Sequence, residues 1–218
     1  MIARPVCRGA WVVCLLVAPA CGEAGTGKNE DLRFVPLIVN AAWTYRVVEA
    51  SDGSVWEKTQ RVEATGTMSD VTGEVFTLVT EQSDGDRTVS FQRASPDGVI
   101  RYREESYKLG DLHQVESYAP SRLRVPLLGS VGDHTRETFR EVDYDGEGRL
   151  IKQTDKTELW TLDSVGPIMV PAGSFARAFG FRRVGSKNTK RFWYVEGVGK
   201  VREEGSDQTE ELTSYQLP

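Results

Sequence analysis

One cysteine near the N-terminus has the sequence context of a residue that becomes chemically modified. Residues 15–25 read LLVAPACGEAG, in which Cys21 directly follows small residues of the kind that signal peptidases recognise. The apolar run over 10–20 follows two arginines and is too short to span a bilayer, which takes about 20 residues. We therefore expect residues 1–20 to be a signal peptide and Cys21 to become the first residue of the mature chain.

Two processing routes fit this N-terminus. Ordinary signal peptidase would leave a free thiol on Cys21, whereas the lipoprotein pathway would attach diacylglycerol to it before cleavage. The stretch resembles a bacterial lipobox, although that motif prefers leucine at the place that Ala18 occupies. Cys7 and Cys14 leave with the signal, so the mature chain would have no intramolecular disulfide and one thiol. Acylation would remove that exposed thiol, and two or more acyl chains would give a stable membrane anchor.

The titratable residues do not form a recognisable catalytic or metal-binding pattern. His113 lies two residues after Asp111, and His134 directly follows Asp133. Two histidines and two aspartates could ligate zinc, but isolated histidines in loops are usually solvated surface groups. The chain has no Gly-x-Ser-x-Gly motif and keeps no cysteine free to act as a nucleophile. We therefore predict a non-enzymatic protein with no cofactor and no metal.

The stretch DYDGEG at 143–148 has some features of a calcium-binding loop. Asp143, Asp145 and Glu147 occupy its first, third and fifth places. An EF-hand also needs a bidentate glutamate at the twelfth place, which here is Thr154. Because the flanking residues alternate as in strands, we interpret the stretch as a hairpin turn.

Four large aromatic residues are candidates for lining a ligand site. Trp43, Tyr45, Trp193 and Tyr194 lie in stretches that alternate as strands do. Aromatic side chains dominate protein cores, so core and sheet packing is the favoured interpretation. The alternative is that they line a pocket for an apolar ligand.

A basic cluster surrounds the sequence GSKNT at 185–189. Its members are Arg182, Arg183, Lys187, Lys190 and Arg191. A solvated hairpin tip whose charges prevent edge pairing is the favoured interpretation. The alternative is a surface that contacts anionic lipid headgroups or an acidic partner.

Charge and composition limit the classes of partner. Removing residues 1–20 takes away two arginines and no acidic residue, which leaves 25 basic and 32 acidic side chains and a net charge of −7. This balance argues against nucleic acid as a partner, because such binding depends on neutralising phosphates. Residues 21–33 have little apolar content, so we expect a lipidated N-terminus followed by a flexible tether.

The rest of the chain, 34–218, is predicted to be a single all-β domain. Turn signals such as SDGS at 51–54 and SPDG at 95–98 separate short alternating runs rich in valine, threonine and aromatic residues. We expect about ten to twelve strands in an antiparallel, strongly curved sheet, open barrel or sandwich. Similar Pro-Leu segments also suggest a weak repeat of two halves, 35–124 and 125–218.

An ordered set of motifs runs along this domain. It comprises PLIVNAAWTYRV from residue 36, VPAGSFARAF at 170–179, WYVEGVGKVREE at 193–204 and ELTSY at 211–215. Together they resemble an uncharacterised group of bacterial exported proteins and lipoproteins, with Asn40 where a glycine is usual. The resemblance implies an antiparallel curved sheet or open barrel related to periplasmic lipoprotein carriers, and no known activity.

Two functional hypotheses follow from these observations. The first is a membrane-anchored lipoprotein of the bacterial cell envelope, on the periplasmic or outer-membrane face, that binds a lipid or other apolar ligand on its curved sheet. The second is an interaction or scaffold component of an envelope protein assembly. For localisation, the alternative is a secreted soluble protein.

Overall fold

The computed structural model describes residues 34–68, 71–82 and 85–218, apart from the side chains of residues 72 and 74. The expected signal peptide, Cys21 and the tether lie outside these residues. The described chain forms twelve β-strands, and none of it forms a helix long and apolar enough to cross a membrane. The strands are β1 (Ala42–Glu49), β2 (Val55–Met68), β3 (Val71–Gln82), β4 (Arg87–Ser95), β5 (Gly98–Lys108), β6 (Asp111–Pro126), β7 (His134–Asp145), β8 (Leu150–Val170), β9 (Gly173–Val184), β10 (Thr189–Val195), β11 (Gly199–Glu204) and β12 (Gln208–Gln216).

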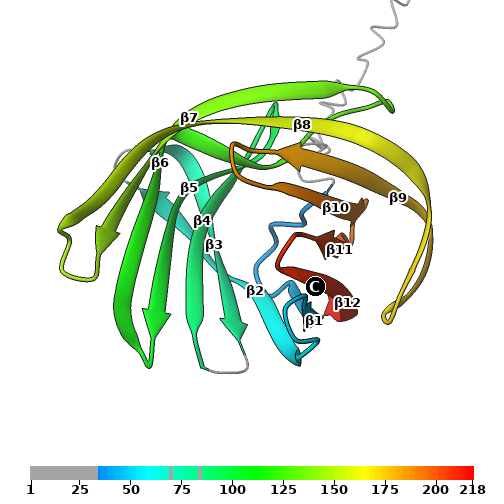
Figure 1. The fold of residues 1–218 in the computed structure, drawn as a ribbon, viewed down its shortest axis with the longest axis horizontal. Helices are drawn as coiled ribbons and strands as arrows, with labels where there is room; N and C mark the ends of the chain where they lie inside the picture. The colour runs from blue at the N-terminus through cyan, green and yellow to red at the C-terminus, as the bar shows by residue number, and fades with distance from the viewer. Residues whose placement is uncertain (1–33, 69–70, 83–84) are drawn as a thin grey trace, which may run out of the picture.

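The strands form one antiparallel sheet that closes into a barrel (Figure 1). Each strand pairs with its neighbours in sequence, and β1 pairs with both β2 and β12. Ala42, for example, lies between Arg61 of β2 and Gln216 of β12. The predicted all-β antiparallel fold is therefore confirmed, and β1 joins the two ends of the curved sheet.

The connections between strands alternate between the two ends of the barrel, because each joins neighbouring antiparallel strands. We call the end with the β1–β2, β3–β4, β5–β6, β7–β8, β9–β10 and β11–β12 turns the open end. We call the other end, where residues 34–41 lead into β1, the closed end. These two ends differ in what fills them.

Alternation along the strands explains how this sequence forms a barrel. In β1, Trp43, Tyr45 and Val47 are buried, whereas Arg46 is exposed. Successive side chains of a strand point to opposite faces, so this pattern gives the strand an apolar inner face and a polar outer face. Just before β1, Asn40 adopts a positive φ of 74°, which glycine or asparagine tolerates best.

β8 is the longest strand and forms a long, curved part of the barrel wall between β7 and β9 (Figure 1). Its 21 residues shift register against β9 between Leu162 and Ser164 and again between Gly166 and Ile168. Such irregularities increase local bending and twist. They let one strand follow the barrel wall and still pair along its length.

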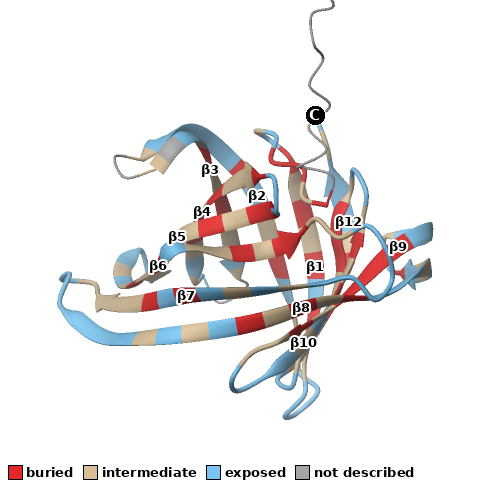
Figure 2. Ribbon diagram, turned by 90° about the horizontal axis from the view of Figure 1, so that it is seen from above, coloured by how far each residue is buried: buried red, intermediate tan, exposed pale blue. Residues whose placement is uncertain are grey.

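The apolar core fills the closed end. Phe34 is 2% exposed, and its ring packs edge-on against Phe179 and Phe181, with centroids 4.9 and 5.3 Å apart. The rings of Trp160 and Phe192 also pack against each other in a tilted arrangement, with centroids 5.4 Å apart. Buried positions recur along the strands in Figure 2, alternating with exposed ones. The closed end is therefore a packed hydrophobic core.

The turns lie where the sequence predicts them. SDGS at 51–54 lies between β1 and β2, residues 96–97 connect β4 to β5, and residues 185–188 form the tip between β9 and β10. The predicted boundary between two similar halves, at residues 124 and 125, falls within β6. The repeat itself stays a prediction.

Candidate functional site

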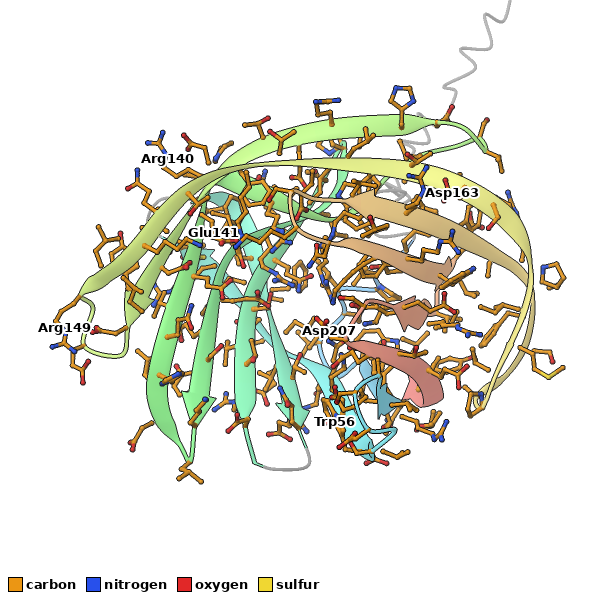
Figure 3. The ribbon with its side chains drawn as sticks, in the orientation of Figure 1. Trp56, Arg140, Glu141, Arg149, Asp163 and Asp207 are labelled. Carbon is orange, nitrogen blue, oxygen red and sulfur yellow. The ribbon has the colours of Figure 1, made fainter. Side chains whose placement is uncertain are left out.

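A cavity of about 520 Å³ occupies the barrel interior toward the open end. Its rim includes Glu49 at the end of β1, Asn188 in the β9–β10 turn and Gln208 at the start of β12. Trp56, labelled in Figure 3, also lines it and donates its indole N–H to Glu49 at 2.9 Å. The volume suits a small molecule, although such sites are usually lined mainly by apolar side chains.

Charged side chains make up much of the cavity wall, and the positive ones predominate. The carboxylates are Glu49, Glu104, Glu203 and Glu210, whereas seven cationic residues face them, an excess of three positive charges. This excess contrasts with the net negative charge of the whole chain. The cationic residues are Lys58, Lys190, Lys200, Arg101, Arg122, Arg124 and Arg183.

One wall holds a network of lysine–glutamate ion pairs. The Nζ atom of Lys200 lies 2.5 Å from carboxylate oxygens of both Glu203 and Glu210. Lys190 donates to Glu203 at 2.8 Å, and Lys58 pairs with Glu210. Burial opposes ionisation of Lys200, but the two carboxylates outweigh it and raise its pKa. The network therefore keeps its carboxylates and Lys200 ionised although they are almost out of contact with water.

Lys58 differs from Lys200 in that its surroundings lower its pKa. Burial, helped by the positive charge of Lys200, lowers the pKa of Lys58 to about 8, although Glu210 and Glu203 favour its charged form. Its side chain also lies over the ring of Tyr45, with Nζ 5.4 Å from the centroid. Lys58 is therefore poised to lose its proton at mildly alkaline pH.

Two arginines that line the cavity, Arg122 and Arg183, share a single carboxylate. Arg122 donates to Glu158 at 2.7 and 3.4 Å, and Arg183 approaches the same carboxylate at 3.8 Å. Arg183 also lies over the rings of Trp160 and Phe192, at 5.4 and 5.1 Å. Burial lowers the pKa of Arg183 to about 10, a value at which it is still charged near neutrality. One carboxylate therefore serves two guanidinium groups.

Arg124 differs from these residues because no carboxylate pairs with its guanidinium group among the described residues. No hydrogen bond or ion pair joins that group to any residue in the described part of the chain. Burial opposes its ionisation, but Tyr194 and the more distant Glu203, Glu104 and Glu210 outweigh this and raise its pKa. Arg124 therefore remains a cation that faces the cavity.

Aromatic residues form the floor beneath the cavity. Trp43 donates its indole N–H to the carbonyl of Val198 at 2.6 Å, and Tyr45 donates its hydroxyl to the carbonyl of Lys200 at 3.0 Å. The space left beside Trp43, Tyr45 and Tyr194 is only about 20 Å³. Of the predicted aromatic candidates, these three lie in the core, and Trp193 faces the other side of the sheet, with Arg202 over its ring at 5.6 Å. The floor leaves no room for an apolar ligand of several carbon atoms.

The predicted basic cluster is divided between the two faces of the barrel. Lys187 and Arg191 are exposed, and Arg182 pairs with Asp163 on the outer face at 2.8 Å. Arg183 and Lys190, however, are register partners that both line the cavity. The prediction of one surface patch is therefore wrong for Arg183 and Lys190, because alternation along β9 and β10 turns them inward.

The histidine and DYDGEG segments form no metal centre in the part of the chain that the structure describes, where no group of three or more possible ligands gathers. His134 is exposed and lies 3.4 Å from the carbonyl of Gly132. DYDGEG spans the end of β7 and the β7–β8 turn, where Asp145 accepts hydrogen bonds from the backbone N–H groups of Glu147 and Arg149 at 3.1 and 2.8 Å. The Asp145 carboxylate thus stabilises the turn.

Comparison with known proteins adds information on the fold. No protein-family model and no curated protein matches the sequence. The structure is similar to a chain from Bacteroides fragilis NCTC 9343, provisionally described as an exported protein with a YmcC-like fold. The TM-score is 0.54 at 14% identity, over 85% of this chain and 99% of that one. A chain from Parabacteroides distasonis ATCC 8503, provisionally described as a lipoprotein, aligns with a TM-score of 0.42 at 14% identity, over 84% and 98% of the two chains. At such identity, the first similarity establishes the fold alone.

Apart from Arg183 and Lys190, the charged residues around this cavity do not stand out in the sequence. Arg122 and Arg124 lie in the stretch SRLRVP, and Lys200 and Glu203 lie in GKVREE. In both stretches, charged residues alternate with or adjoin valine and leucine, a pattern that also fits a solvent-exposed strand face. These charged residues line an interior cavity only because the sheet closes into a barrel.

Proposed function

We propose that this chain is a lipid-anchored exported protein of the bacterial cell envelope that binds a small polar molecule inside its barrel and catalyses no reaction. The observation that carries the proposal is the charged cavity of about 520 Å³ at the open end. Its volume lies within the range of small-molecule sites. The lipobox-like context of Cys21 and the exported description of the Bacteroides fragilis chain support an envelope location.

The polarity of the cavity favours a polar ligand over a lipid tail. Burying an acyl chain against ionised lysine, arginine and glutamate groups would strip them of water without replacing their hydrogen bonds. The apolar part of the interior, around Trp43 and Tyr45, leaves only about 20 Å³ free. The apolar-ligand hypothesis therefore has less support than binding of a polar molecule.

The position of the anchor favours a ligand that arrives from the aqueous side. Phe34, at the start of the described chain, packs at the closed end, whereas the cavity opens at the other end. A flexible tether over residues 21–33 would span about 20 Å. A lipid on Cys21 would then hold the closed end toward the bilayer and leave the cavity facing away from it.

Native mass spectrometry of protein purified from its own membranes tests both parts of the proposal. We expect an N-terminal mass that includes diacylglycerol on Cys21, together with a bound small polar molecule. A Cys21→Ser variant should lose the added mass and leave the membrane fraction. Protein that carries neither an acyl chain nor a small molecule would contradict the proposal.

A scaffold role is the second candidate, and exposed apolar side chains at the closed end favour it. Met169 on β8 is 76% exposed and Tyr215 on β12 is 41% exposed. The ring of Tyr215 lies 6.4 Å from that of Phe175, which joins this part of β12 to the β8–β9 hairpin. A stoichiometric envelope complex that Met169→Glu and Tyr215→Glu abolish, with the cavity empty, would support this role over ligand binding.

A further inference from the structure

We propose that the cavity binds an oxyanion, a phosphate or carboxylate group carried by a small polar molecule, through Arg124 and the neighbouring Arg183. This inference deepens the proposed binding function and rests on it. It depends on the charge balance, on the placement of Arg124 and on the chemistry of the surrounding wall.

The charge balance around Arg124 lacks negative charge. Among the described residues, Arg122 and Arg183 have one carboxylate within ion-pair distance, that of Glu158, and Arg124 has none. Arg122 and Arg124 are both close enough to Arg183 for their charges to lower its pKa. Placing like charges together in a partly desolvated interior is unfavourable, so an anion bound among them would be strongly favoured.

The other cations of the cavity already have partners. Lys200 is held between Glu203 and Glu210, and Arg101 pairs with Glu104. Lys200 therefore has little capacity left for a ligand, whereas Arg101 keeps a buried Nε without a hydrogen-bond partner and could add a donor to the site. Arg124 is the cationic lining residue whose guanidinium lacks a hydrogen bond or ion pair within the described residues, and its five N–H donors are available.

The backbone fixes Arg124 at the base of the cavity. The hydroxyl of Tyr194 donates to the carbonyl of Arg124 at 3.4 Å, and the N–H of the preceding Leu123 donates to Glu137 at 2.7 Å. Arg124 borders both the large cavity and the small space beside the aromatic floor. The backbone of Arg124 is therefore held where its side chain can meet a ligand that enters from the open end.

The cavity wall formed by β2, β3 and β4 indicates which groups the ligand carries besides the oxyanion. It carries uncharged hydrogen-bonding side chains, including Gln60, Thr80, Thr88, Ser90 and Gln92. A guanidinium group binds phosphate or carboxylate through two parallel hydrogen bonds, whereas amides and hydroxyls suit the hydroxyl groups of an organic molecule. The ligand class is therefore a small hydroxylated phosphate or carboxylate.

Isothermal titration calorimetry on the full mature chain in detergent micelles tests the inference. The probes are glycerol 3-phosphate, succinate and uncharged glycerol. We expect at least one oxyanion to bind and glycerol not to bind. Arg124→Met should weaken the oxyanion by about tenfold or more, whereas the control Arg140→Met, on the outer face beside Asp155, should bind as the wild type does.

Two outcomes separate this inference from the proposed function. If Arg124→Met binds oxyanions as tightly as the wild type, or if only glycerol binds, the oxyanion inference is wrong and binding in the cavity stands. If the wild type binds no probe and purifies from membranes with no small molecule, the proposed binding function is wrong as well.

A vesicle experiment distinguishes the two sources of a phosphate group. Arg124-dependent binding of soluble glycerol 3-phosphate, with none to phosphatidylglycerol vesicles, would assign the ligand to the aqueous phase, as the orientation of the cavity leads us to expect. Arg124-dependent binding to the vesicles alone would assign the oxyanion to a lipid headgroup. Either result supports an oxyanion site at Arg124.

Discussion

Lys200 donates to Glu210 over 2.5 Å at a place where their side chains are only 5% and 3% exposed. Glu210 also pairs with Lys58 and accepts a hydrogen bond from Gln208 at 2.6 Å. Folding removes water from each of these charged groups, which costs free energy. The short, charge-assisted hydrogen bonds of the network offset that cost. Its members consequently depend on one another.

Replacing one carboxylate of this network should destabilise the barrel strongly. Glu210→Gln would leave Lys58 and Lys200 buried with one carboxylate fewer, and breaking a buried pair typically costs about 3–5 kcal/mol. Urea unfolding of the two proteins measures the change. Glu147→Gln, at a side chain that is 72% exposed, is the control and should change stability by less than about 0.5 kcal/mol. Equal effects of both substitutions would contradict the account.

The lowered pKa of Lys58 makes the stability depend on pH in a definite direction. The unfolded chain holds this proton up to about pH 10.5, whereas the folded barrel releases it near pH 8. Between these values the unfolded state binds more protons, so this residue makes stability rise as the pH rises. From pH 7.5 to 10 we expect a contribution of about 2 kcal/mol.

A Lys58→Met variant separates the pH dependence of stability that Lys58 causes from that of the other titratable groups. The variant should lack the rise between pH 7.5 and 10, whereas Lys187→Met, at an exposed turn residue, should keep it. Urea midpoints across that range provide the measurement. A Lys58→Met profile parallel to that of the wild type would show that Lys58 titrates at its ordinary pH in the folded protein.

Arg124 should contribute little to stability in the absence of a ligand. Its guanidinium has no ion pair in the described residues, and the cost of its burial is offset by Tyr194, Glu203, Glu104 and Glu210. We expect Arg124→Met to change the free energy of unfolding by less than about 1 kcal/mol in phosphate-free buffer. Differential scanning calorimetry measures the change, and a larger loss of stability would mean that Arg124 supports the fold.

Local sequence patterns sufficed to predict the strands and turns. The alternation of Trp43, Tyr45 and Val47 predicts β1. Local patterns do not predict closure of the barrel, because closure depends on pairing Ala42 with Gln216, far apart in the sequence. Local propensity carries no information about which distant edge strands meet.

The cavity was harder to predict than the fold, for a related reason. Charged residues on a strand face indicate solvent unless that face lines the inside of a barrel. Register shifts blur the pattern further: one lies between Trp193 and Tyr194 against β11, and another between Arg101 and Arg103 against β6. A bulge changes which side chains face inward. Arg183 and Lys190 therefore looked like members of a surface cluster.

Phe34 should be essential to the closed end although it precedes the first strand. Its side chain is 2% exposed and packs against Phe179, Phe181 and Tyr194, so it seals the floor beneath the cavity. Phe34→Ala should cost about 3–5 kcal/mol, because truncating a buried phenylalanine removes its contacts and leaves a void. Urea unfolding measures the loss, and Leu109→Ala, at a 92% exposed turn residue, is the control, expected to change stability by less than about 0.5 kcal/mol. If Phe34→Ala were as stable as the control, residues 34–41 would lie on the barrel without supporting it, and the closed end would owe its stability to the strands alone.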